Sequence, residues 1–125
     1  MAGVEILIAL AAERPGPEAG VRVLVDRAMP RGVRREDAPW EHWHPEVAPS
    51  NDLRGWWNGD PAKFALFEKQ YLTELAMPKG TSAVQRLRGA AGARPLVLVT
   101  ALGDAASNHA LVLRRLLLGE AAAPR

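Results

Sequence analysis

Residues 96–118, LVLVTALGDAASNHALVLRRLLL, decide the fold class because they comprise one strand, one loop and one helix. Residues 96–100 form a short, nearly continuous apolar run, which is typical of a buried strand. Residues 102–106, LGDAA, contain glycine and aspartate and predict a loop. Residues 108–118 then carry apolar side chains at helical spacing, and Gly119 is expected to end the helix.

Two further strands are predicted nearer the N-terminus. Residues 4–10, VEILIAL, and residues 21–25, VRVLV, are short apolar runs, separated by a loop rich in proline and glycine at 13–20. Strands that are separated by helices predict an α/β fold, with a small, mostly parallel sheet flanked by helices in a single domain. That domain is expected to cover residues 1–118, with residues 119–125 as a frayed tail.

Helix-start signals appear twice in the middle of the chain. Ser50 is a good N-cap and predicts a short helix through Trp57. Asp60 followed by Pro61 predicts a second helix start, since proline suits the first helical position. The second helix keeps one apolar face, made by Phe64, Phe67, Tyr71, Leu72 and Leu75.

Proline and glycine then predict a break between this helix and the next. Pro78 and Gly80 are expected to end the second helix. Thr81 or Ser82 is expected to cap a further helix, which continues to Ala91.

Composition excludes several classes of chemistry. The 125 residues include no cysteine, so disulfides, thiolate zinc sites and sulfur nucleophiles are excluded. The 16 basic residues nearly balance 14 acidic ones, so extended nucleic-acid binding is not expected. No apolar run is long enough for a bilayer, and no signal peptide is evident, so a cytoplasmic protein without membrane contact is expected.

An anion-binding cleft is predicted where the strands end. In open parallel sheets, ligands bind outside the carboxyl ends of the strands. Asp26 and Arg27 follow one predicted strand, and residues 100–109 follow the last one, so both segments should face one crevice. The guanidinium forks of Arg27 and Arg31 suit carboxylate or phosphate oxygens. The alternative is that these arginines pair with nearby acids and hold the connecting segment in place.

The start of the last helix adds candidate residues. Backbone N–H groups near Ser107 and Asn108 lack helical partners and attract an anion. The alternative is that Ser107 or Asp104 caps the helix. His109 could serve as a general base oriented by Asp26 or Asp104, although a packing role is the alternative. His42 and His44 have no third ligand at suitable spacing, so no metal is expected.

Four tryptophans lie within eighteen residues, at positions 40, 43, 56 and 57. Together with Arg54 they could stack on nucleobases. The alternative is that they form a second layer over the sheet, with one ring partly exposed.

Four motifs resemble the YeaO-like branch of the domain-of-unknown-function 488 (DUF488) family. They are VLVDRAMPRG, APSNDLRGWW, DPAKFALFEKQYLTEL and ALGDAASNHALVL, which occur in the family's order from about residue 4 to 118. The resemblance implies a small bacterial cytoplasmic α/β protein with no established substrate. Asp104, Asn108 and His109 fit the family's pattern, whereas Met29 stands where the family usually has tryptophan.

Three functions remain open from the sequence. The first is a small enzyme, a hydrolase or transferase, acting on an anionic molecule through aspartate and histidine. The second is a non-catalytic ligand or nucleic-acid module that uses arginine and exposed tryptophan. The third is an interaction protein, such as a homodimer that associates through its tryptophan-rich segment. No cofactor is expected for any of the three.

Overall fold

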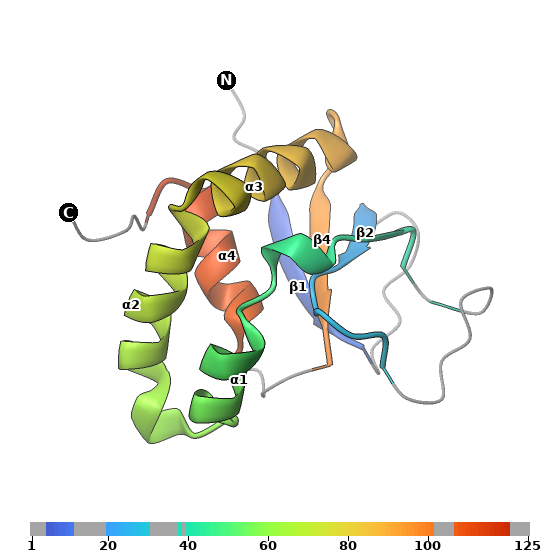
Figure 1. The fold of residues 1–125 in the computed structure, drawn as a ribbon. Helices are drawn as coiled ribbons and strands as arrows, with labels where there is room; N and C mark the ends of the chain where they lie inside the picture. Colours follow the sequence, from blue (N-terminus) through green and yellow to red (C-terminus); the bar gives the residue numbers. More distant parts are fainter. Residues whose placement is uncertain (1–4, 12–19, 31–37, 39, 102–106, 121–125) are drawn as a thin grey trace.

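The computed structural model describes residues 5–11, 20–30, 38, 40–101 and 107–120, which form a parallel sheet with helices packed against it (Figure 1). The strands are β1 (Ile6–Leu10), β2 (Val21–Leu24), β3 (His42–Trp43) and β4 (Leu96–Thr100). Their order across the sheet is β1-β4-β2-β3, and all three pairings are parallel. The α/β fold expected from the sequence is therefore confirmed.

Strand β4 lies in the interior of the sheet. It pairs along its whole length with β1, and residues 96–99 pair with β2 on its other side. All five of its residues are buried. Burial on both faces explains why residues 96–99 are continuously apolar rather than alternating.

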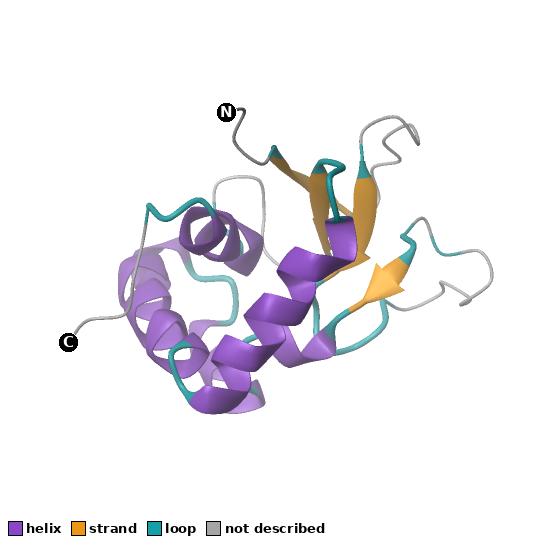
Figure 2. Ribbon diagram, turned by 90° about the horizontal axis from the view of Figure 1, so that it is seen from above, coloured by secondary structure: helices purple, strands orange, loops and turns teal. Residues whose placement is uncertain are grey.

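The helices are α1 (Asn51–Trp57), α2 (Phe64–Leu75), α3 (Pro78–Ala91) and α4 (His109–Leu117), with short 3-10 turns η3 (Pro45–Val47) and η4 (Pro61–Lys63). Figure 2 shows the α-helices gathered on one side of the sheet. The predicted N-caps at the starts of α1 and η4 are confirmed, because the Ser50 and Asp60 side chains accept hydrogen bonds from backbone N–H groups. At α4 the cap is Asn108 instead of the expected Ser107 or Asp104, and its side chain accepts a hydrogen bond from the N–H of Leu111 at 3.0 Å.

The sheet has a different covering on each face. Alternate residues such as Val23 and Leu98 pack against the helices in the main core, together with Phe67 and Leu113. The opposite face carries Leu24, Val97 and Val99, covered by Trp40 with Trp43 and Met29.

The four tryptophans therefore divide between packing and exposure. Trp40 and Trp43 lie on the sheet face opposite the helices. Trp57 is buried and stacks on Phe67 with ring centroids 4.3 Å apart. Trp56 is 41% exposed. Trp40 and Trp43 fit the expected layer over the sheet and Trp56 is the partly exposed ring, whereas Trp57 packs in the main core instead.

Two local predictions were wrong. Strand β3 was not expected within the connection at 33–50, because its two residues show no apolar pattern and depend on pairing with β2. Helix α3 begins at Pro78 rather than at Thr81 or Ser82. Proline at the first helical position lacks only an N–H that would be unpaired there anyway, so it starts this helix instead of ending α2.

Several expectations lie outside the described residues. They concern the loops at 12–19 and 102–106, the segment 31–37 and the tail from 121 onward. The expected domain boundary at residue 118 therefore stays a prediction. Among the described residues, no helix is long and apolar enough to cross a membrane.

Candidate functional site

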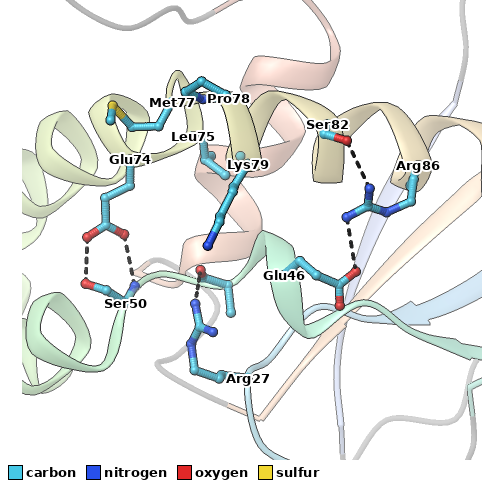
Figure 3. Close-up of a pocket in the computed structure, with 12 residues that line it drawn as sticks. Arg27, Glu46, Ser50, Glu74, Leu75, Met77, Pro78, Lys79, Ser82 and Arg86 are labelled. Atoms are coloured by element: carbon cyan, nitrogen blue, oxygen red, sulfur yellow. Dashed lines mark hydrogen bonds and ion pairs between the residues drawn. The ribbon is translucent and has the colours of Figure 1, made fainter.

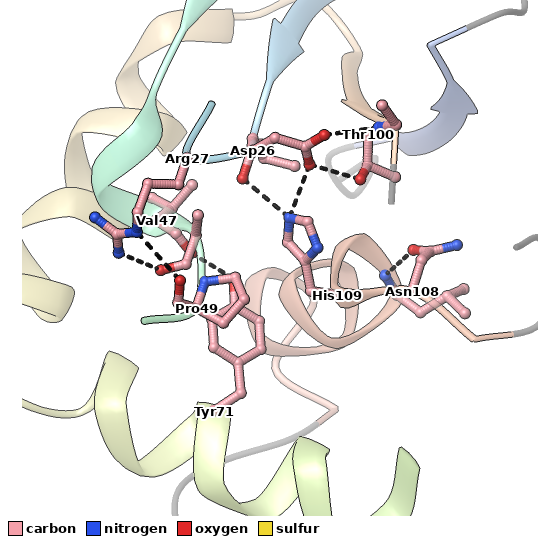
Figure 4. A network of polar contacts seen from close by, with 12 residues as sticks. Asp26, Arg27, Val47, Pro49, Tyr71, Thr100, Asn108 and His109 are labelled. Atoms are coloured by element: carbon pink, nitrogen blue, oxygen red, sulfur yellow. Dashed lines mark hydrogen bonds and ion pairs between the residues drawn. The ribbon is translucent and has the colours of Figure 1, made fainter. Parts of the chain in front are cut away.

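The carboxylate of Asp26 joins the carboxyl ends of two strands (Figure 4). Asp26 follows β2 and is 2% exposed. Its Oδ1 accepts a hydrogen bond from Thr100 Oγ1 at 2.6 Å, and its Oδ2 accepts one from the backbone N–H of Ala101 at 2.7 Å. The two segments that the sequence placed at one sheet edge do converge there.

His109 completes this network from the first turn of α4. Its Nε2 lies 3.0 Å from the carbonyl oxygen of Val25 and 3.2 Å from Asp26 Oδ1. Both partners are acceptors, so Nε2 carries a proton. The side chain is fully buried, and its Nδ1 has no hydrogen-bond partner among the described residues.

This geometry describes a cross-link between β2, β4 and α4. The oxygens of Asp26 and the Nε2 of His109 face protein partners rather than an open cleft. A substrate would have to displace those partners to reach either group. The catalytic roles expected for Asp26 and His109 stay predictions, and Asp104 lies outside the described residues.

Tyr71 supports the same region from α2. Its hydroxyl donates a hydrogen bond to the carbonyl oxygen of Val47, and its ring meets that of His109 edge to face, with centroids 6.0 Å apart. Burial raises the pKa of Tyr71 well above its ordinary value, and the nearby carboxylate of Glu74 acts in the same direction. The native protein therefore holds the phenol in its neutral form.

We expect Tyr71→Phe to lower the free energy of unfolding by about 1–2 kcal/mol at neutral pH, because the buried carbonyl of Val47 loses its donor. The substitution should also flatten the alkaline pH dependence. Above pH about 10 the unfolded tyrosine releases its proton while the native one keeps it, so wild-type stability falls as pH rises. Urea unfolding between neutral pH and pH about 11 measures both effects.

Thr73→Ala is the control for this prediction, because Thr73 is an exposed residue of the same helix with only a local hydrogen bond to the Lys69 carbonyl. The control should keep the wild-type pH profile. If Tyr71→Phe loses as much stability at alkaline pH as the wild type does, groups other than Tyr71 cause that loss.

Arg27 lies beside the buried network but faces a different space. Its Nε donates to the carbonyl oxygen of Pro49 at 3.2 Å, and its Nη2 donates to that of Ala48 at 3.0 Å. These contacts fix the guanidinium while leaving further N–H groups available. Among the described residues, no carboxylate lies within ion-pair distance of Arg27.

A hollow of about 610 Å³ opens in front of Arg27 (Figure 3). It lies between the start of α3 and the segment from η3 to α1. Three cationic side chains line it, and two carboxylates do so as well. These five residues are Arg27, Lys79, Arg86, Glu46 and Glu74.

Both carboxylates of the hollow already have partners. Glu74 accepts hydrogen bonds from the N–H and the hydroxyl of Ser50, at 2.9 and 2.6 Å. Glu46 lies 3.8 Å from the guanidinium of Arg86. Lys79 forms no ion pair within the part of the chain that is described, and Figure 3 shows it extending from α3 toward the Arg27 side of the hollow. The hollow therefore carries more positive charge than its own acids neutralise.

The structure separates three other predicted ligand-binding residues from this hollow. Arg54 is exposed on α1 and does not line it. Ser107 and Asn108 are buried at the start of α4, where Asn108 serves as the cap. Arg31 lies outside the described residues.

Sequence reasoning missed Lys79 and Arg86. The sequence pattern that could have identified them is their helical spacing with Ser82, because positions separated by three and four residues share one helix face. That pattern was hidden because the helix was expected to begin only at residue 81 or 82.

The two histidines within the connection at 33–50 do not form a ligand cluster. The rings of His42 and His44 meet edge to face, with centroids 6.4 Å apart. Burial lowers the pKa of His44, and the charge of Glu46 partly opposes this effect. Within the described residues, no group of three histidines or acids is placed to hold a metal ion.

The fold and the site thus define a small α/β protein with a cationic hollow beside a buried Asp–His network. The chain matches the sequence model of a family described as the "Inactive DUF488-N3 subclade" over residues 5–125. It belongs to the DUF488 family, in the YeaO-like branch, as the sequence motifs indicated.

Individual relatives cover most of the chain. The uncharacterized protein YeaO of Escherichia coli (strain K12) is 39% identical over 94 residues, which are 75% of this chain and 80% of that protein. The uncharacterized protein Rv3073c of Mycobacterium tuberculosis (strain ATCC 25618 / H37Rv) is 40% identical over 103 residues, 82% of this chain and 85% of that protein. No solved structure matches the chain.

Proposed function

We propose that this protein binds a small anion, a phosphate or a carboxylate, in the hollow in front of Arg27 without catalysing a reaction on it. The observation that carries the proposal is the pair of cations, Arg27 and Lys79, that face the hollow without a carboxylate partner among the described residues. The guanidinium of Arg27, held by two carbonyl oxygens, and the ammonium of Lys79 can both donate charge-assisted hydrogen bonds to one anion.

Two observations favour binding over catalysis. The groups suited to proton transfer, Asp26 and His109, are buried and engaged with each other and with the backbone. The family description is also that of an inactive subclade. A binding function needs only the hollow, whereas a catalytic one would need a general base within reach of the ligand.

The test is calorimetric titration with inorganic phosphate, sulfate and acetate. Lys79→Gln should weaken binding of the preferred anion by about tenfold, since a hydrogen bond to a charged group contributes roughly 1.5–3 kcal/mol. Arg27→Gln should weaken it at least as much. Because Arg27 also holds two backbone carbonyls, Lys79→Gln is the variant whose fold is expected to be unaffected.

Arg54→Gln is the matched control, because it removes the same charge from an exposed helix position outside the hollow. It should leave affinity unchanged. If Arg54→Gln and Lys79→Gln lose the same affinity for the anion, net charge alone attracts it. Absence of binding to any of the three anions at millimolar concentration would overturn the proposal.

A further inference from the structure

A second hollow adjoins the cationic one across the Ser50–Glu74 pair. Its volume is about 390 Å³, and it lies between α1 and α2. Ser50 and Glu74 line both hollows, so a ligand in one can extend over this pair into the other. The remaining lining residues are Asp52, Leu53, Trp56 and Gln70.

The two hollows differ in chemistry. The second hollow is lined by no lysine or arginine among the described residues, and it presents the carboxylate of Asp52 and the amide of Gln70. Carboxylates accept hydrogen bonds, and an amide both accepts and donates them, which suits hydroxyl groups. A second anionic group would meet Asp52 and Glu74 and be repelled.

Trp56 gives the second hollow an apolar wall. The residue is 41% exposed, and the Lys63 ammonium lies 5.1 Å from the ring centroid. An exposed aromatic surface gains free energy when the C–H face of a sugar ring displaces water from it. A few polar groups around such a surface then fix the orientation of the ligand.

We propose that the ligand is a sugar phosphate, with its phosphate beside Arg27 and Lys79 and its hydroxyl groups in the hollow bounded by Asp52, Gln70 and Trp56. This inference rests on the proposed anion binding and assigns the class of ligand. The carboxylates of Asp52 and Glu74 would also attract the ammonium of a phosphorylated amine, but such a ligand leaves the Trp56 ring and the Gln70 amide without a partner, so a sugar phosphate fits better.

The experiment compares dissociation constants for inorganic phosphate, glucose 6-phosphate, ribose 5-phosphate and phosphoethanolamine. At least one sugar phosphate should bind about tenfold or more tightly than phosphate, which corresponds to about 1.4 kcal/mol of added contacts. Trp56→Ala and Gln70→Ala should return that affinity to the level of phosphate while leaving phosphate binding unchanged. Adenosine monophosphate is also titrated. If it binds more tightly than ribose 5-phosphate, the ligand is a nucleotide. If it binds equally or more weakly, the ligand is a free sugar phosphate.

Two control variants match the tests. Leu66→Ala removes an exposed large apolar side chain from α2 and matches Trp56→Ala. Gln85→Ala removes an exposed amide from α3 and matches Gln70→Ala. Neither residue lines either hollow, so both variants should keep wild-type affinities. The inference is overturned if phosphate binds but the sugar phosphates bind no more tightly, or if phosphoethanolamine is preferred. It is also overturned if Trp56→Ala weakens the binding of inorganic phosphate. Failure of phosphate to bind at all would instead remove the proposed function.

Discussion

Asp26→Ala should lower the free energy of unfolding by about 3–5 kcal/mol, because it removes the acceptor of several buried donors and each donor left unpaired costs about 1–3 kcal/mol. The carboxylate accepts from the Thr100 hydroxyl and the Ala101 N–H, and it lies 3.2 Å from His109 Nε2. Removing it leaves buried donors without this acceptor. Such a loss is a large fraction of the 5–15 kcal/mol that stabilises an ordinary domain. Urea unfolding measures it.

Asp26→Asn is the milder variant, and it keeps the experiment informative where the alanine variant fails to fold. Its amide oxygen can still accept from Thr100, but its NH₂ group would face the N–H of Ala101, so an intermediate loss is expected. Glu41→Ala is the control, because Glu41 is exposed and lies 4.0 Å from its two arginine partners. That change should stay within about 0.5 kcal/mol of wild type.

A small loss would change the interpretation of the whole network. If Asp26→Ala costs less than about 1 kcal/mol, the carboxylate does not stabilise the fold in proportion to its contacts. The catalytic role predicted for Asp26 with His109 would then become the better explanation for a buried acid at this edge of the sheet.

Local patterns were sufficient to predict most of the fold. Continuous apolarity identified β4, because a strand buried on both faces needs no polar alternation. Capping chemistry identified the starts of α1 and η4, since Ser50 and Asp60 satisfy backbone donors within their own turns. These features depend on residues close in sequence, which is why single-sequence reasoning reached them.

Features set by distant partners were not predictable in the same way. Strand β3 exists only through its pairing with β2, and nothing within His42–Trp43 indicates a strand. The convergence of Asp26 with Thr100 could be predicted, because the carboxyl ends of parallel strands meet at one edge. That the same carboxylate would be enclosed by its partners depends on how α4 packs, which no local pattern specifies.

The position of the hollow shows the same limit. Arg27 was identified from its place after β2, but its cationic neighbours come from α3, and Pro78 was interpreted as a helix end. A helix beginning at Pro78 places Lys79 in its first turn and Arg86 two turns later. The hollow then arises from packing of α3 against η3, which only the tertiary structure provides.

The close contact between α2 and α3 predicts that Gly80→Ala is also strongly destabilising. A Cβ at Gly80 would lie 2.6 Å from the Cα of Leu75 and 2.7 Å from the carbonyl oxygen of Glu74. These are backbone atoms, so the helices must separate, and overpacking of this kind costs about 1–3 kcal/mol. Urea unfolding should show that loss.

Gly89→Ala is the matched control on the same helix, because a Cβ there meets no atom within 4 Å. It should stabilise the protein by about 0.4–1 kcal/mol, since alanine favours the helical conformation more than glycine does. Gly80 also lines the cationic hollow. Gly80→Ala should therefore weaken phosphate binding as well as stability, whereas Gly89→Ala should leave binding unchanged. Wild-type stability in Gly80→Ala would show that the start of α3 shifts without cost, and the hollow would then not be held rigidly enough to preorganise Lys79.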